Sequence, residues 1–184
     1  MNALWTYFWP ALGFGLVLGI LAGSITFRVR IVRSKDRPNE PTLVGQPRRK
    51  RVVLLTGGVA AAILGAALWH GPLGAADRFS GEVERSARQV LVDNDAPMGM
   101  TARIHHGPLT RQLVLSGPGN DFQRSEAARL LSQIPGVSGA VWTPTAGIPL
   151  IVEGAVAAVV GFLFGLLLAY LVELRRRYNA QWNW

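Results

Sequence analysis

The stretch LWTYFWPALGFGLVLGILAGSITF, residues 4–27, contains no charged side chain. A helix of this length reaches about 36 Å, enough to cross the roughly 30 Å hydrocarbon core of a bilayer with some tilt. Trp5, Tyr7 and Trp9 stand at its start, and aromatic rings favour the membrane–water interface. The stretch therefore predicts a first transmembrane helix over residues 4–27.

A cleaved signal peptide is the alternative interpretation of this run. Such a peptide carries its positive charges before the apolar segment, whereas Arg28 and Arg30 follow it here. Ala22-Gly23-Ser24 does offer the small residues that a signal peptidase accepts. We expect the helix to be retained.

Two further apolar runs predict spans over residues 52–70 and 149–174. The second span is the shortest, and Thr56, Gly57 and Gly58 lower its hydrophobicity. Basic residues flank it on one side, and Trp69-His70 flanks it on the other. No charge lies at the middle of any run, and an ion or proton path normally needs ionisable groups at depth. The pattern therefore argues against a transporter or channel.

The net charge of +8 is concentrated beside the apolar runs. The loop 28–51 is strongly basic and the tail 175–184 carries three arginines, whereas acids and bases balance over 71–148. This distribution is typical of membrane topology rather than of a nucleic-acid-binding face. Basic loops stay in the cytoplasm, so we expect the N-terminus and 71–148 on the periplasmic side of a bacterial inner membrane.

Residues at the cytoplasmic boundary are expected to contact lipid headgroups or a partner protein, because arginine and aromatic side chains suit both. They are Arg48, Arg49, Lys50, Arg51, Arg175, Arg176, Arg177, Trp182 and Trp184. The segment 34–47, which precedes Arg48 in the loop after the first span, contains three prolines and few apolar residues, so we expect it to be extended.

Small residues recur every four positions in all three spans, which places each set on one helix face. Such faces let backbones approach closely, and that is how helices associate in lipid. We predict helix packing through them, within the chain or against another membrane protein. They are Gly15, Gly19 and Gly23, then Gly57, Ala61 and Gly65, then Ala157, Gly161, Gly165 and Ala169.

The region 71–148 predicts a small soluble domain. Apolar residues at helical spacing predict helices from an Asp77 N-cap to Asp93, and over 122–134 after a cap at Asn120 or Asp121. Alternating residues predict strands over 100–105, 110–116 and 137–142. The fold class is therefore α+β, with three transmembrane helices and an αββαβ two-layer domain, residues 77–143, between spans two and three.

This element order, with LVLSGP at 113–118 before a helix and IPGV at 134–137 after it, resembles the BON domain family. Gly117, Gly136 and Val137 stand at the matching turns. The resemblance covers about residues 77–143 and implies a non-enzymatic envelope module that binds phospholipid or other proteins. The chain departs from the usual family layout, because two spans precede the domain and a third span follows it. That departure puts a cell-wall tethering role in doubt.

The sequence offers no case for an enzyme. It contains no cysteine, which excludes disulfides and thiolate chemistry. His105 and His106 are adjacent where a predicted strand meets a turn, and adjacent strand residues point to opposite faces, which disfavours a shared metal ion. The segment 116–120 lacks the lysine of a phosphate-binding loop. We predict no catalytic, cofactor-binding or metal-binding residue.

Two functions fit these features. The first is an inner-membrane scaffold or envelope protein whose BON-like domain binds lipid headgroups or partner proteins. The second is an accessory subunit of a larger energy-transducing complex, respiratory or photosynthetic, packed through its small-residue faces. Membrane lipids and another membrane protein are the expected partners, and nucleic acid is not.

Overall fold

The computed structural model describes the backbone of residues 3–33 and 41–182, and the side chains of 3–29 and 45–179. The chain forms two compact units. The domain unit comprises Met1–Pro10 and Ala67–Gly154, and the span unit comprises Ala11–Ala66 and Ala155–Trp184. The elements in chain order are α1 (Ala3–Thr26), β1 (Arg30–Arg33), β2 (Pro41–Val44), α2 (Arg48–His70), α3 (Ala75–Asp93), β3 (Thr101–His106), β4 (Leu109–Ser116), α4 (Asp121–Leu131), β5 (Gly139–Val141) and α5 (Leu150–Trp182).

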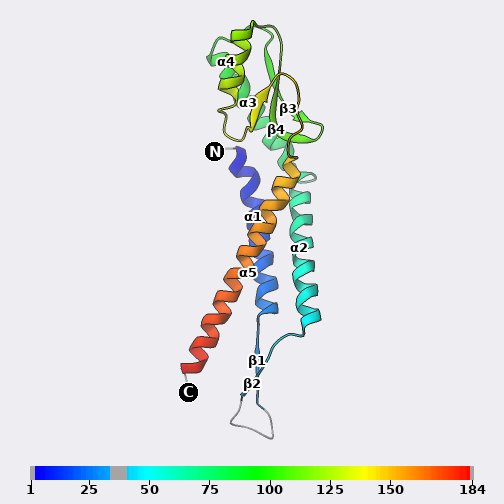
Figure 1. The fold of residues 1–184 in the computed structure, drawn as a ribbon, viewed down its shortest axis with the longest axis vertical. Coiled ribbons are helices and arrows are strands. Elements are labelled where there is room, and N and C mark those ends of the chain that lie inside the picture. Colours follow the sequence, from blue (N-terminus) through cyan, green and yellow to red (C-terminus); the bar gives the residue numbers. More distant parts are fainter. Residues whose placement is uncertain (1–2, 34–40, 183–184) are drawn as a thin grey trace. The chain divides into compact units, whose positions relative to one another are not determined.

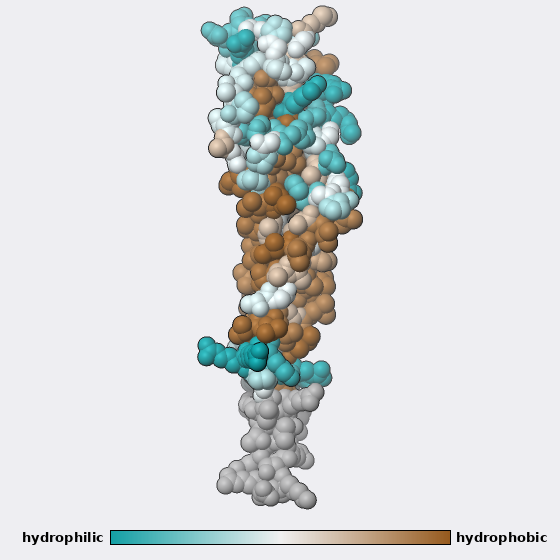
Figure 2. Space-filling model, turned by 90° about the vertical axis from the view of Figure 1, so that its right-hand side faces the viewer, coloured by the Kyte–Doolittle hydropathy of each residue, from teal (hydrophilic) through white to brown (hydrophobic). Residues whose placement is uncertain are grey.

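Three helices are long and apolar enough to cross a membrane: Ala3–Thr26, Arg48–His70 and Leu150–Asn179. Figure 2 shows hydrophobic residues covering the helices of the span unit, with hydrophilic residues where those helices end. Three candidate spans with an α/β insert between the second and the third confirm the predicted fold class. They also indicate a membrane protein.

The second and third candidate spans, α2 and α5, extend beyond the predicted apolar runs. Helix α2 already begins at Arg48, where the amide of Arg51 donates to the Pro47 carbonyl at 3.2 Å. Arg48–Arg51 thus form its first turn instead of the end of a loop. Helix α5 continues past Arg177 to Trp182, because no proline or glycine interrupts these helix-forming residues.

The basic loop contains a hairpin that the sequence did not predict. Strand β1 pairs antiparallel with β2, with Arg30 opposite Val44 and Arg33 opposite Pro41. Pro41–Val44 is extended, as expected for the 34–47 segment, but its pairing as a strand was not predicted; residues 34–40 of that segment lie outside the described residues. Ile31, Val32 and Thr42 are β-branched and favour a strand, and proline is tolerated at the first position of an edge strand.

The insert is a two-layer αββαβ domain, as the sequence predicts. Its sheet has the order β3-β4-β5, with β3 antiparallel and β5 parallel to β4. Figure 1 shows α3 and α4 beside the strands. One core joins both layers, and its main residues are Phe79, Val83, Ala87 and Leu91 of α3, Ile104, Leu113, Leu115 and Ala140 of the sheet, and Ala127 and Leu131 of α4.

The helix caps differ in detail from the expectation. Gly74, at φ 69°, precedes α3, so Asp77 lies inside the first turn and is not the N-cap. Its carboxylate there still favours the positive end of the helix dipole. Helix α4 is capped by Asn120, whose side chain accepts from the Gln123 amide at 2.8 Å, while the Gln123 side chain accepts from the Asn120 amide at 3.0 Å. It ends at Leu131, three residues earlier than expected.

Two turns of the domain require glycine. Gly117 has φ 122° and Gly136 has φ 102°, values that side chains with a Cβ rarely adopt. At Gly117 a Cβ would also collide with the backbone of Gly99 and Met100. These are two of the positions on which the resemblance to the BON family rests.

Candidate functional site: packing faces and a charged groove

Helices α1 and α5 approach one another closely within the span unit. A Cβ built at Gly15 or Gly19 would overlap the backbone of Ala158 or Phe162. Reciprocally, a Cβ at Gly161 would overlap the backbone of Leu12. Five predicted glycines lie on this contact, namely Gly15, Gly19, Gly23, Gly161 and Gly165, and Gly23 faces the Ala169 side chain.

On α5, the buried alanine at the start of the packing face is Ala158 and not the predicted Ala157. Ala158 is fully buried, whereas Ala157 is only half-buried. A helix has 3.6 residues per turn, so a strict spacing of four drifts around the helix. The buried face therefore shifts by one residue over a few turns.

Helix α2 packs through a face adjacent to the predicted one. A Cβ at Gly57 would meet no atom within 4 Å, and Ala61 is exposed. The buried residues of α2 are Ala62 and Ala66. Gly58 lies against the Phe162 ring and Gly65 against the Phe14 ring. Of the predicted row, Gly65 therefore contacts another helix, whereas Gly57 faces open space and Ala61 is exposed.

The basic residues predicted at the cytoplasmic boundary lie near the start of α2 and the end of α5, and they are exposed. Arg175 and Arg176 project from α5, whereas Arg177 donates to the Phe27 carbonyl at 2.9 Å and contacts Glu173 at 3.4 Å. Arg48, Arg49, Lys50 and Arg51 lie on the first turn of α2. Trp182 is the last residue of α5, and its side chain, like the whole of Trp184, lies outside the described residues.

A buried tyrosine joins three helix ends within the domain unit. The Tyr7 hydroxyl lies 2.6 Å from His70 Nδ1 and donates to the Leu150 carbonyl at 3.3 Å. The Trp69 indole donates to the Tyr7 carbonyl at 3.0 Å. Tyr7 is 2% exposed, so it is not the interfacial aromatic that its position near the N-terminus indicates. It connects the beginnings of α1 and α5 to the end of α2.

Sequence reasoning missed this cluster. The available signal was that Tyr7 continues the small-residue face of α1, eight positions before Gly15, with Ala3 and Ala11 on the same face. A polar aromatic residue on an otherwise small, buried face needs a hydrogen-bond partner. The partner, His70, is distant in sequence, and only the fold brings it close.

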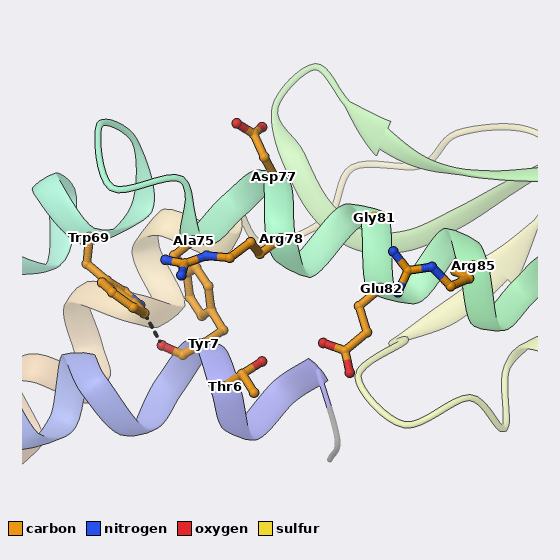
Figure 3. A pocket seen from close by; sticks show the side chains of 9 residues that line it. All are labelled: Thr6, Tyr7, Trp69, Ala75, Asp77, Arg78, Gly81, Glu82 and Arg85. Carbon is orange, nitrogen blue, oxygen red and sulfur yellow. Dashed lines mark hydrogen bonds between the residues drawn. The ribbon is translucent and has the colours of Figure 1, made fainter.

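A groove of about 470 Å³ opens next to this cluster. Its walls come from the first residues of α1, the end of α2 and the polar side of α3. Figure 3 shows Glu82 pointing toward α1 and Asp77 pointing away from it. The lining residues are Thr6, Tyr7, Trp69, Ala75, Asp77, Arg78, Gly81, Glu82 and Arg85.

Arg78 is held in place at one end of this groove. Its guanidinium donates to the Leu73 carbonyl at 2.9 Å and, through Nε, to the Gly74 carbonyl at 3.2 Å. The same group lies 4.9 Å from the centre of the Trp69 ring. Arg85 and Glu82 have no ion-pair partner among the described residues. The groove thus offers two guanidinium groups and a carboxylate beside an aromatic wall.

The two adjacent histidines lie elsewhere and serve different contacts. His105 Nδ1 is 3.2 Å from the Pro108 carbonyl, and His106 Nε2 is 3.8 Å from Glu84. Glu84 also accepts from the Ile104 amide at 3.0 Å. Residues 3–33 and 41–182 contain no cluster of three metal-ligating side chains.

The chain matches no family model, no curated protein and no solved structure.

Proposed function

We propose that this chain is a non-enzymatic protein of a bacterial inner membrane, whose periplasmic BON-like domain binds phospholipid headgroups at its base. The charged groove is the observation that supports this proposal. Three of its residues, Thr6, Tyr7 and Trp69, belong to the ends of candidate spans. Ends of spans lie at the membrane surface, so the groove opens at the depth of the headgroups.

The chemistry of the groove matches a zwitterionic headgroup. Guanidinium groups bind phosphate oxygens through parallel hydrogen bonds, and Arg78 and Arg85 offer two of them. Glu82 provides a carboxylate for a headgroup ammonium. Trp69 is an amphipathic ring of the kind that sits at headgroup level. Phosphatidylethanolamine carries the required phosphate and primary ammonium together.

The BON-like assignment of the domain has two supports. The first is the element order αββαβ. The second is the positive φ of Gly117 and Gly136 at the turns after β4 and before β5. The implied role of that family, binding of phospholipid or protein, agrees with a groove that offers guanidinium and carboxylate groups beside an aromatic ring.

The test is lipid retention by the full-length protein. The purified chain in mild detergent is titrated with phosphatidylethanolamine and analysed by native mass spectrometry, with the double variant Arg78→Gln/Arg85→Gln beside it. We expect the double variant to retain about thirtyfold less lipid, because each of the two arginines near a headgroup contributes on the order of 1 kcal/mol. Arg88→Gln is the matched control, an exposed arginine on the same helix that does not line the groove. Equal retention by all three proteins contradicts the proposal.

The accessory-subunit function remains the second candidate, and α2 favours it. That helix buries only Ala62 and Ala66, which leaves the small residues Gly57 and Ala61 uncovered for a helix of another protein. Gly15 and Gly19 cannot test this function, because they contact α5 of the same chain. The variant Gly57→Leu/Ala61→Leu tests it instead. A subunit role is supported if the parent protein migrates in a large assembly on a native gel and the variant does not. It is opposed if the parent protein and the variant both migrate as monomers.

A further inference from the structure

A second groove lies within the span unit, at the end of α1 that leads into the basic loop. Its volume is about 730 Å³, within the roughly 300–1,000 Å³ range of ligand pockets. Its walls come from the last turns of α1, from α5 and from Gln46. This is the end that the positive-inside rule assigns to the cytoplasm.

Both sides of this groove lead to an arginine. Ile20 and Ser24 of α1 precede Arg28, which lies two residues beyond the end of that helix, and Leu168 and Val172 of α5 precede Arg176. The spacing of four places Ile20 with Ser24 on one face of α1, and Leu168 with Val172 and Arg176 on one face of α5. Apolar side chains therefore line the part toward the membrane interior, and guanidinium groups line the part at the boundary.

The charges at this boundary do not cancel. Glu173, the acid that lines the groove, accepts from Arg177 Nε and from the Val29 amide, both at 3.4 Å. Arg28 and Arg176 have no acidic partner among the described residues. Both are exposed. The groove thus keeps two unneutralised cations directly beyond an apolar channel.

We propose that this groove binds one anionic glycerophospholipid, such as phosphatidylglycerol. Arg28 and Arg176 bind the headgroup phosphate, and the Ser24 hydroxyl lies at the depth of the glycerol backbone. An acyl chain runs along Ile20, Leu168 and Val172. A free phosphate ion satisfies only the arginines, so the apolar part of the groove selects a lipid. A lipid with a net neutral headgroup compensates one positive charge fewer at Arg28 and Arg176 than an anionic lipid does.

The experiment is a lipid titration of the full-length chain in detergent, followed by native mass spectrometry. Phosphatidylglycerol is compared with phosphatidylcholine of the same acyl chains and with glycerol 3-phosphate, which lacks acyl chains. We expect phosphatidylglycerol to bind at least about tenfold more tightly than either. Arg28→Gln/Arg176→Gln is expected to abolish this preference, whereas Arg88→Gln/Arg103→Gln, which removes two exposed arginines of the domain that do not line the groove, is expected to keep it.

A second variant separates the two parts of the groove. Val172→Trp fills the acyl channel at an exposed position and leaves both arginines in place, so phosphatidylglycerol is expected to bind more weakly. Equal binding of glycerol 3-phosphate and the lipid, or equal losses in both arginine double variants, overturns the proposal. Arg78→Gln/Arg85→Gln is expected to leave phosphatidylglycerol binding at this site intact. The proposal for the groove in the domain unit and the proposal for this groove can therefore fail independently of one another.

Discussion

At the scale of single residues, Tyr7 shows how one polar group can organise several helix ends. Its ring is buried among apolar residues of the domain unit, packed at a 5.9 Å centroid distance from Phe79. Its hydroxyl reaches His70 and the Leu150 carbonyl. A buried hydroxyl without partners is costly, so these contacts favour one arrangement of the three helix ends.

Tyr7→Phe is predicted to destabilise the protein by about 1–3 kcal/mol, because it leaves His70 Nδ1 and the Leu150 carbonyl without their shared partner. Thermal unfolding in a mild detergent measures the effect as a lower midpoint. Tyr170→Phe is the control, since Tyr170 is 46% exposed and its midpoint is expected to stay unchanged. Equal midpoints for Tyr7→Phe and the parent protein contradict the proposed role of the hydroxyl.

Glu126 and Arg129 form a pH-sensitive pair on α4. Hydrogen bonds from the Arg129 guanidinium hold the pKa of Glu126 below its ordinary value. A carboxyl with a lowered pKa in the folded state adds stability above its unfolded pKa, and loses it as the pH falls through the folded pKa. Arg129→Gln is predicted to raise the pKa of Glu126. An NMR titration of labelled glutamate side chains checks this, and an unshifted pKa argues against the pair.

At the scale of elements, the contact between α1 and α5 depends on the absence of side chains. Interfaces of this kind let helix backbones meet directly and gain van der Waals contacts in lipid, where no hydrophobic driving force acts between helices. Glycine in the middle of a helix otherwise costs about 1 kcal/mol relative to alanine. The close approach at Gly15, Gly19, Gly161 and Gly165 offsets that cost.

Substitutions of two glycines by alanine are therefore predicted to have opposite signs. Gly19→Ala places a Cβ against the Phe162 carbonyl and is expected to destabilise the protein by about 1–3 kcal/mol. Gly57→Ala meets nothing within 4 Å and is expected to be neutral or to stabilise it by up to about 1 kcal/mol. Unfolding by sodium dodecyl sulfate in mixed micelles measures both. Destabilisation by Gly57→Ala to the same extent argues against the packing face.

The start of α4 depends on its capping box. Asn120→Ala removes the acceptor for the Gln123 amide and is predicted to cost about 1 kcal/mol. Hydrogen exchange at residues 121–124 is expected to accelerate, because the first turn loses its cap. Asn120→Ser restores an acceptor at the same position and is expected to exchange nearly as slowly as the parent protein. Fast exchange in both variants indicates a different origin of the protection.

At the scale of the whole molecule, the order of the spans determines which segments share a side of the membrane. The αββαβ domain follows α2, and the end of α5 follows one further span. Since a single candidate span separates them, we expect them on opposite sides of the membrane. The concentration of arginine and lysine in the loop 28–51 and after Leu174 predicts that these two segments face the cytoplasm.

This topology predicts a labelling pattern in intact cells. The chain contains no cysteine, so each introduced thiol is the sole target. Met98→Cys, at a position that is 98% exposed in the domain, is expected to react with a maleimide that does not cross the inner membrane. Arg175→Cys is expected to react only after the membrane is opened. The reverse pattern contradicts the orientation, and labelling of both without opening contradicts the third span.

The sequence by itself determined the fold class, because its signals are local. The absence of charge over long runs predicts spans, and apolar periodicity predicts the order αββαβ. The turn chemistry of Asn120, Gly117 and Gly136 is equally local. Ends of elements were less well predicted, since helix-forming residues carry α2 and α5 beyond their apolar runs into Arg48–Arg51 and Arg175–Trp182.

The tertiary structure decided which surfaces meet and what they hold. A small-residue row is the same signal whether it is buried or exposed, so α2 could not be assigned the Ala62 and Ala66 face from sequence. The Tyr7–His70 contact joins residues 63 positions apart, and no local pattern encodes that pairing. Both grooves likewise combine residues from separate helices. Local chemistry determines elements, whereas the close packing of distant side chains determines the sites.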